Sequence, residues 1–345
     1  MMFERSPKMS AWRTLSRRLA LGLSVGGFVA FGHSAIAQPI KIGLVKFPSS
    51  APFYIAVERG YFTAEGLTPE LVYFDSGLPI ALGVVSGNLD FAASGLTGAF
   101  YSLAGQGALR IIGGLHREGP GFHTQEIVVS KSTYEHGLRS LQDLGGHSFG
   151  VSQIGSPADY ALVRTTEKYG INLKTIKLVQ LQSIPNVVSG ISGGQIDATI
   201  LPAAAIRAGV ERGDLQPLGW VGDETPFQIG AAFTAAKTAN EKHAEVEGFL
   251  RAMHKGARDY HDAYVDAKGQ RRDGPGAAEI TSIISKYTGE APERVKNELA
   301  SIDAEGKLDV ADILHQIAWY KSQGVVKAEV DGNNIIDRRY VVPQE

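Results

Sequence analysis

Three short segments of this chain have the composition of helix N-termini that could hold a polar or negatively charged small molecule. They begin at Phe47, Ser94 and Ser156, and each combines serine with glycine or proline. The first turn of a helix leaves backbone N–H groups without intrahelical partners, and the helix dipole adds partial positive charge there. Such segments therefore predict contacts to carboxylate, sulfonate or other acceptor groups.

Several residues within or beside these segments are candidates for direct contact with a ligand. They are Ser49, Ser94, Gly95, Thr97, Gly155 and Ser156. The two glycines would let a ligand approach the backbone closely. Helix capping alone also explains Ser94 and Ser156, so both interpretations stay open.

Aromatic side chains near the same segments could form the apolar wall of a binding cleft, because ligand clefts are mostly apolar with a few directed polar groups. The candidates are Phe47, Phe53, Tyr54, Tyr160 and Phe227. Phe53 and Tyr54 are neighbours in a helical pattern, so one of the two is expected to point into the core instead.

Four further side chains could contact a ligand from the loops that follow expected strands. Arg117 matches the geometry of a carboxylate or sulfonate, although an exposed loop arginine is the competing interpretation. Gln153 and Gln182 could form hydrogen bonds with neutral or acidic ligands. Pro202 follows another expected strand and opens a helix.

No catalytic, metal or cofactor site is expected from the remaining motifs. Residues 190–194 match a Gly-x-Ser-x-Gly pattern, but they end a helix and precede a strand, which is the reverse of a nucleophile elbow. His116, His123 and Glu126 lack the tight spacing of metal ligands. The chain has no cysteine, which excludes disulfides and cysteine metal sites.

The elements that must position these residues alternate between strands and helices from residue 40 onward. Alternation at this spacing predicts an α/β fold with doubly wound, largely parallel sheets. The phrases Gly87-Asn88-Leu89-Asp90 and Gly194-Gln195-Ile196-Asp197 each join a helical pattern to a short buried strand. One helix-strand unit used twice predicts two lobes.

The order of the elements predicts that the chain crosses between the lobes twice. The last third contains only helical patterns after a strand at about residue 230, so it is expected to return to the first lobe. We therefore expect lobe 1 to comprise residues 38–124 plus 228–345 and lobe 2 residues 125–227. Two crossings would make a hinge.

Residues 1–37 have the pattern of a secretory signal peptide. Arg13, Arg17 and Arg18 precede an uncharged stretch at 19–31, which is too short for a membrane span, and a small-x-small site ends at Ala37. The arginine pair also resembles a twin-arginine export signal. Cleavage would leave 308 residues and change the formal net charge from −2 to −6, which disfavours nucleic acid as a partner.

The mature chain resembles a known family of periplasmic proteins. The resemblance rests on residues 52–62 (Pro-Phe-Tyr-Ile-Ala-Val-Glu-Arg-Gly-Tyr-Phe), the two Gly-x-x-Asp phrases, residues 141–146, and the segments 319–324 and 336–340 near the C-terminus. They are similar to the substrate-binding proteins for sulfonates, nitrate, taurine and the thiamine pyrimidine precursor. The resemblance implies a two-lobed, type II-like periplasmic binding fold whose lobes close on a ligand.

The resemblance also implies the partners. The expected ligand is a small organic anion, a sulfonate or a carboxylate, and the expected macromolecular partner is the permease of an ABC importer. The protein is expected in the periplasm as a monomer that is not embedded in a membrane. A neutral aminopyrimidine ligand and a sensor partner stay open as alternatives. A pyrimidine-synthesising enzyme of the same fold is disfavoured, because such enzymes carry a cysteine-rich motif and work inside cells.

Overall fold

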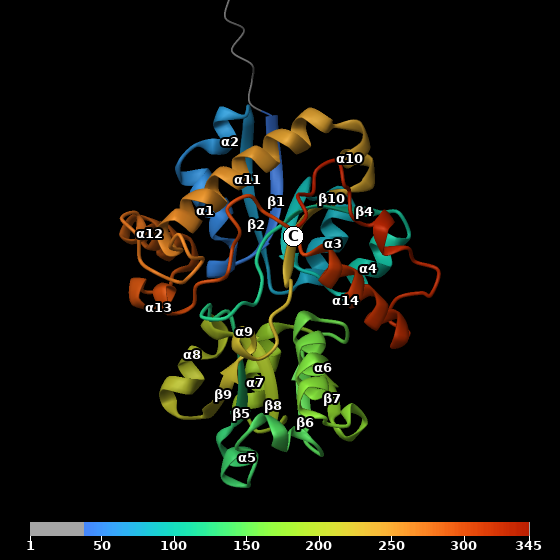
Figure 1. The fold of residues 1–345 in the computed structure, drawn as a ribbon, viewed down its shortest axis with the longest axis vertical. Helices are drawn as coiled ribbons and strands as arrows, with labels where there is room; N and C mark the ends of the chain where they lie inside the picture. Colours follow the sequence, from blue (N-terminus) through green and yellow to red (C-terminus); the bar gives the residue numbers. More distant parts are fainter. Residues whose placement is uncertain (1–37, 345) are drawn as a thin grey trace, which may run out of the picture. The chain divides into compact units, whose positions relative to one another are not determined.

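Residues 38–344 are described by the computed structural model, and they form two lobes that are each built on one five-stranded sheet (Figure 1). The predicted export signal, residues 1–37, lies outside this part of the chain. Between residues 38 and 344 no helix is both long and apolar enough to cross a bilayer.

The first sheet has the strand order β2-β1-β3-β10-β4. Strands β1 and β2 pair in parallel, as do β1 and β3, whereas β10 pairs antiparallel with both of its neighbours. The strand bounds are β1 (Gln38–Val45), β2 (Leu67–Phe74), β3 (Phe91–Gly95), β4 (Leu109–Gly114) and β10 (Gly230–Ala235).

The second sheet repeats this arrangement with the order β7-β6-β8-β5-β9. Here β6 pairs in parallel with β7 and β8, and β5 is the antiparallel strand. The strand bounds are β5 (Gln125–Ser130), β6 (Ser148–Val151), β7 (Lys177–Gln180), β8 (Ala198–Pro202) and β9 (Leu215–Trp220).

The α/β fold with largely parallel sheets is confirmed, but the antiparallel fourth strand of each sheet was not predicted. It follows from the two crossings. Each crossing leaves one sheet and enters the other on the side where the parallel strands end, so the entering strand, β5 or β10, must run away from that side. This single reversal lets both sheets turn the carboxyl ends of their parallel strands toward the same space.

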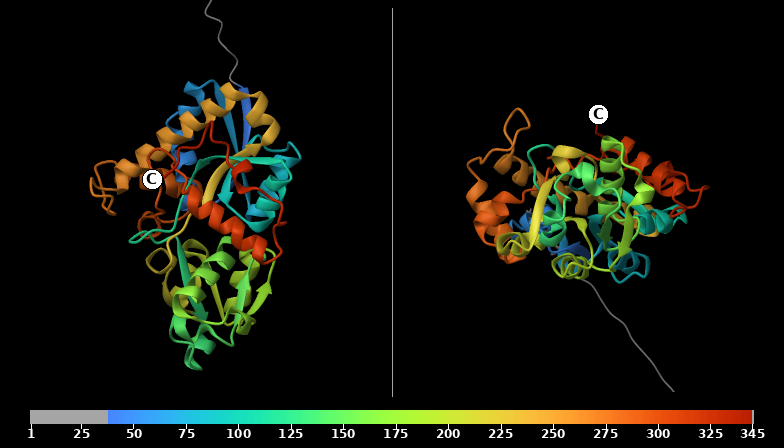
Figure 2. Two further views of the ribbon diagram at one scale, coloured as in Figure 1. Left: turned by 45° about the vertical axis from the view of Figure 1, so that its right-hand side comes forward. Right: turned by 90° about the horizontal axis from the view of Figure 1, so that it is seen from below.

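Helices cover both faces of the sheets (Figures 1 and 2). The helices of the first lobe are α1 (Ala51–Glu58), α2 (Tyr61–Ala64), α3 (Gly77–Val85), α4 (Gly98–Gly105), α10 (Ala236–Glu241), α11 (His243–Tyr264), α12 (Ala277–Thr288), α13 (Pro292–Asn297) and α14 (Val310–Ser322). Those of the second lobe are α5 (Lys131–Glu135), α6 (Pro157–Tyr169), α7 (Ile184–Ser192), α8 (Ala203–Arg212) and α9 (Val221–Glu224). Four short 3-10 turns lie at Pro48–Ser50, Leu141–Leu144, Leu173–Thr175 and Gly332–Asn334.

The two Gly-x-x-Asp phrases have the same structural role in the two lobes. Gly87 and Gly194 adopt left-handed φ angles of 76° and 69° at the ends of α3 and α7. Asp90 then accepts a 2.8 Å hydrogen bond from the backbone N–H of Lys41 in β1, and Asp197 accepts one of 2.8 Å from Ser148 in β6. Both aspartates therefore fasten a turn to the second strand in the order of their sheet, β1 or β6.

The helices after β10 pack back on the first lobe. In particular, α11 lies against α1 and β3, where the ring of Phe249 stacks on that of Phe91 with centroids 4.1 Å apart. On the opposite face of the sheet, Phe100 of α4 packs on Phe233 of β10 at 4.8 Å. The expected return of the chain to lobe 1 is thus seen, while the exact lobe boundaries at 124/125 and 227/228 stay a prediction.

The two crossings run side by side between the sheets. Glu118 donates its backbone N–H to the carbonyl of Phe227 (2.9 Å), and Leu115 donates to Gly230 (3.1 Å). Helix α14 runs along the boundary of the lobes next to them (Figure 2). A paired, two-stranded connection of this kind can flex at few bonds, which is the property expected of a hinge.

Candidate functional site

A cleft of about 710 Å³, including its open mouth, lies between the two sheets. Its walls come from the point where each parallel strand ends and the next helix begins, which is where open α/β sheets bind ligands. The first lobe contributes the junctions after β1, β2 and β3, and the second lobe those after β6, β7 and β8. Six strand-to-helix junctions therefore surround one space.

The first-lobe wall carries small polar groups at helix starts. Thr97 caps α4, and its Oγ1 accepts a 3.0 Å hydrogen bond from the N–H of Phe100. Ser76 precedes α3 without a side-chain capping bond, so its hydroxyl remains available to the cleft. Besides His116, the remaining first-lobe residues of this wall are Val45, Phe47, Ser49, Gly77, Gly95 and Ile229.

The second-lobe wall mixes polar and apolar groups. Ser156 caps α6, where its Oγ accepts from the N–H of Asp159 at 3.4 Å. Burial raises the pKa of the Asp159 carboxyl to about 6, although that group also accepts a 2.8 Å bond from the N–H of Gly155. The other residues of this wall are Gln125, Ser152, Gln153, Pro157, Ala158, Ile184, Ile200, Leu201 and Pro202.

Among the described residues that line the cleft, none is lysine, arginine, aspartate or glutamate. His116, on the first crossing, is the titratable side chain of the lining, and burial lowers its pKa to about 4, so the ring is neutral at physiological pH. In this lining, partial positive charge can come only from helix N-termini, because the described lining has no cationic side chain. Such a site suits hydrogen-bond acceptors and a partly apolar body.

Seven of the residues predicted from the sequence line this cleft together. They are Phe47, Ser49, Gly95, Thr97, Gln153, Ser156 and Pro202. The structure places the other five elsewhere: Phe53, Ser94, Arg117, Gly155 and Gln182.

The predicted aromatic wall is mostly core. Phe53 is fully buried and packs on Phe249 of α11, with ring centroids 5.9 Å apart. Tyr54 is also fully buried and stacks on Tyr287, so both neighbours point inward rather than one. Tyr160 and Phe227 pack against each other at the lobe boundary. Only Phe47 of the five aromatic candidates reaches the cleft, because it lies in the loop before the first helical turn.

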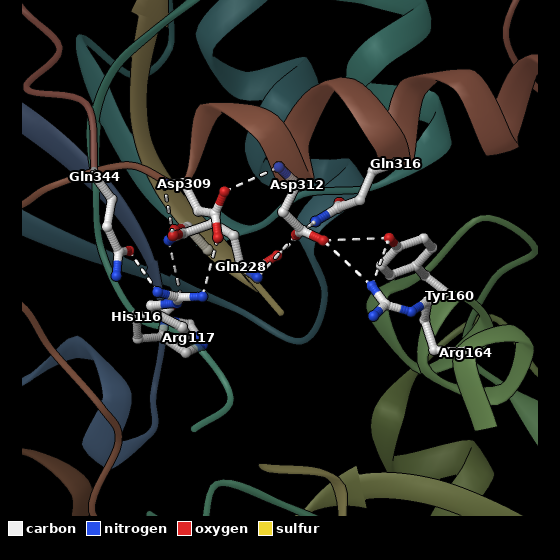
Figure 3. A network of polar contacts seen from close by, with 10 residues as sticks. His116, Arg117, Tyr160, Arg164, Gln228, Asp309, Asp312, Gln316 and Gln344 are labelled. Atoms are coloured by element: carbon white, nitrogen blue, oxygen red, sulfur yellow. Dashed lines mark hydrogen bonds and ion pairs between the residues drawn. The ribbon is translucent and has the colours of Figure 1, made fainter. Parts of the chain in front are cut away.

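Arg117 does not face the cleft. Its guanidinium forms an ion pair with Asp309 at 3.0 Å and a hydrogen bond with Gln344, both from the C-terminal part of the chain (Figure 3). Asp309 caps α14, so Arg117 fastens that helix to the first crossing. The prediction of a ligand counter-charge at Arg117 thus loses its geometric basis.

The three remaining candidates do not line the cleft. Ser94 lies in strand β3 and does not cap a helix, because Thr97 caps α4 instead; it is buried and donates to the carbonyl of Gly95 at 3.3 Å. Gly155 accepts a 2.7 Å hydrogen bond from the N–H of Gly98, so it joins the lobes to each other. Gln182 has a left-handed φ of 73°, lies exposed in the turn between β7 and α7, and is not among the residues that line the cleft.

Ser76, Gln125 and His116 also line the cleft but were not predicted from the sequence. Ser76 carries the same signal as Ser94 and Ser156, a serine next to glycine before a helix, and could have been found. Gln125 and His116 lie on and beside the first crossing. Their position depends on how the crossing folds over the cleft, and no local pattern encodes that.

The lobes contact each other at several places beside the cleft. Besides the bond between Gly98 and Gly155, Arg207 of α8 donates to Glu298 at 3.1 Å. The hydroxyl of Tyr160 on α6 donates to Asp312 of α14 at 3.2 Å (Figure 3). These contacts join the two lobes in the arrangement that the structure shows.

Comparison with known proteins shows that the chain has the fold of periplasmic binding proteins. The model of the family described as NMT1/THI5 like matches residues 47–263. The alkanesulfonate-binding protein SsuA from Xanthomonas axonopodis pv. citri, bound to MOPS, has a TM-score of 0.69 and 18% identity over 87% of this chain and 98% of its own. None of the curated protein sequences matches the chain.

Two further solved structures have the same fold. The periplasmic aliphatic sulphonate binding protein SsuA from Escherichia coli has a TM-score of 0.66 and 16% identity, covering 88% of this chain and 98% of its own. The periplasmic nitrate-binding protein NrtA from Synechocystis PCC 6803 has a TM-score of 0.66 and 14% identity, covering 88% of this chain and 87% of its own. At these identities the likeness concerns the fold.

Proposed function

Because this chain belongs to the NMT1/THI5-like family, we propose that it is an extracytoplasmic solute-binding protein that delivers a small molecule to an ABC importer. The fold is that of periplasmic proteins that bind sulfonates and nitrate. The expected export signal at residues 1–37 agrees with a periplasmic location.

The observation that carries this proposal is the convergence of six helix starts on a cleft whose described lining has no acidic or basic side chain. Helix N-termini stabilise acceptor groups and negative charge. Apolar residues such as Ile184 and Leu201 line the rest. We therefore propose a small organic anion, a sulfonate or carboxylate with an apolar body, as the ligand.

The binding mechanism is a shift of population between open and closed lobes. A ligand that touches both walls stabilises the closed arrangement by its differential affinity for it. Direct contacts between the lobes, such as the hydrogen bond of Gly98 with Gly155, also stabilise the closed arrangement. The closed form is then the one that the permease receives, and no covalent bond changes.

A neutral aminopyrimidine is the second candidate ligand. It is favoured by one specific observation, that Arg117 is paired with Asp309 and leaves the lining without a cationic side chain. A neutral ligand would use the same hydroxyls and amides of the cleft.

A thermal-shift panel of ethanesulfonate, MOPS, benzoate, nitrate and 4-aminopyrimidine tests both candidates on the mature chain. A probe at about a hundred times its dissociation constant should raise the free energy of unfolding by roughly 2.7 kcal/mol. Stabilisation by a sulfonate or carboxylate supports the anion, and stabilisation by 4-aminopyrimidine alone supports the second candidate. A panel in which no probe binds contradicts the proposed function.

Recovery of the bound probe separates binding from catalysis. A binding protein returns the probe with unchanged mass after denaturation. Conversion of the probe, with or without added iron, would revive the interpretation of the chain as an enzyme of this fold.

A further inference from the structure

His116 occupies a special position, because its side chain lines the cleft while its backbone belongs to the hinge. Its carbonyl accepts hydrogen bonds from the backbone N–H groups of Ile229 (3.2 Å) and Gly230 (3.0 Å) and from Nε2 of Gln228 (3.2 Å), all on the second crossing (Figure 3). One residue thus touches the ligand space and ties the two crossings together.

The ring of His116 is closely packed, and neither of its nitrogens has a hydrogen-bond partner among residues 38–344. The side chain is only 6% exposed. It packs on Gly230, where a Cβ atom would lie 2.7 Å from Cε1 and 2.8 Å from Nδ1, so no larger residue fits opposite the ring. Nδ1 is buried and has no hydrogen-bond partner within the described chain. A nearly buried imidazole without a protein partner is unusual. Because Nδ1 is shielded, a partner from outside can meet the ring only at Nε2.

The tautomer of this ring follows from its surroundings. A neutral imidazole carries its proton on one nitrogen. A buried N–H with no acceptor costs more than a bare nitrogen in the same place, so the proton is better placed on Nε2 than on the shielded Nδ1. The ring then offers one donor, and only at Nε2.

The charged groups near His116 leave this neutral form undisturbed. Arg117 is paired with Asp309, and Glu298, which lines a side pocket together with His116, is paired with Arg207. Glu118 accepts a 2.6 Å bond from Thr124. Arg117 and Glu298 are therefore engaged with partners other than the imidazole, and burial raises the pKa of Glu118 to about 8, so that its carboxyl is mostly uncharged at pH 7.

We propose that His116, as its Nε2–H tautomer, donates a hydrogen bond to an acceptor oxygen of the bound solute and thereby connects the solute to the hinge. This inference rests on the proposed function, since it requires a solute in the cleft. It also narrows the ligand class: the group that reaches the hinge is a carboxylate, sulfonate or carbonyl oxygen, and a ligand that offers only donors there is excluded.

Nitrogen NMR of the ligand-free protein tests the tautomer directly. Long-range ¹H–¹⁵N correlation at pH 7 distinguishes the two neutral tautomers from the imidazolium, and the spectrum of His116→Phe identifies the His116 signals. The expected result is a neutral ring protonated at Nε2. A ring protonated at Nδ1, or at both nitrogens, overturns the proposal.

Binding of the panel probes to two variants tests the role of the donor. His116→Phe keeps a flat ring and removes the donor, whereas His116→Gln places an amide N–H near the position of Nε2. For the probe that binds the wild type most tightly, calorimetry should show about a tenfold or greater loss with phenylalanine and about threefold or less with glutamine. His123→Phe is the matched control, because His123 lies on the same crossing outside the cleft lining and stacks on Trp220.

The outcomes separate this proposal from the function on which it rests. If His116→Phe binds the probe as tightly as the wild type, the donor role is refuted and the binding function stands. If no probe binds the wild type, the proposed function fails, and the donor role fails with it. Thermal melts of the ligand-free variants check folding, and removal of an unsatisfied buried nitrogen should leave their stability unchanged or higher.

Discussion

Replacing Glu118 with glutamine should make the protein more stable, and increasingly so as the pH rises from 5 to 8. Glu118 lies on the first crossing and is 1% exposed. Its Oε1 accepts a 2.6 Å hydrogen bond from the hydroxyl of Thr124, whereas Oε2 is buried without a partner in the described chain. A carboxylate in this place loses its hydration and gains too few hydrogen bonds in return.

The magnitude follows from the pKa. Burial raises the pKa of Glu118 to about 8 in the folded protein, compared with 4.5 for an ordinary glutamate. An acid whose pKa is raised by folding binds its proton more tightly in the folded state than in the unfolded state. Its stabilising contribution is fully present below the unfolded-state pKa and is lost as the pH rises toward the folded-state pKa. One pH unit corresponds to about 1.4 kcal/mol, so the wild type should lose on the order of 2–4 kcal/mol relative to the glutamine variant between pH 5 and 8.

Reversible urea unfolding at pH 5, 6, 7 and 8 measures this difference. Glu329→Gln is the control, because the side chain of Glu329 is 74% exposed and the same charge change there should give a small, nearly constant difference. A constant difference for Glu118→Gln over the whole pH range would mean that Glu118 is ionised in the folded state, and the reasoning from burial would be refuted.

Five further substitutions, arranged in three tests, probe the lobe contact at Gly155, the ion pair of Arg117 and the two Gly-x-x-Asp turns. Gly155→Ala and Gly87→Ala both place alanine at a left-handed φ and should each lower the free energy of unfolding by about 1–2 kcal/mol, but only Gly155→Ala, at the lobe contact, should weaken probe binding by calorimetry. Equal effects on binding would contradict the closed-state role of that contact. Arg117→Ala should leave probe affinity within about twofold of the wild type, since the guanidinium faces the C-terminal segment, and a tenfold loss would place it in the site. Asp197→Ala should lower the free energy of unfolding in urea by about 2–4 kcal/mol and Asp90→Ala by about 1–2 kcal/mol. The reason is that the Asp197 carboxylate accepts three hydrogen bonds, whereas the Asp90 carboxylate accepts one. A larger loss for Asp90→Ala than for Asp197→Ala would refute this account.

The elements and the helix starts could be predicted from the sequence because their signals are local. A glycine at a helix end or a serine before a proline acts through backbone angles and hydrogen bonds within a few residues. The helix that begins after Pro202 and ends at Gly213 illustrates this, since α8 has those limits and Gly213 adopts a φ of 78°. The two Gly-x-x-Asp phrases likewise indicated the repeated architecture.

The direction of the fourth strand in each sheet depended on tertiary structure. The sequence of β10 predicts a strand, but its antiparallel orientation follows from where the second crossing enters the first sheet. A strand pattern has no direction of its own, since alternation and burial read the same from either end.

The sequence by itself determined most of the helix starts and the existence of two similar lobes, because those properties depend on neighbouring residues. The start expected at Ser94 is an exception, since Ser94 lies in β3 and Thr97 caps α4. The tertiary structure decided which side chains meet the cleft. Arg117 finds its ion-pair partner 192 positions away at Asp309, and His116 enters the cleft because both crossings pair beneath it. Long side chains and loop residues take the partners that the packed chain brings within reach, and no local pattern specifies those partners.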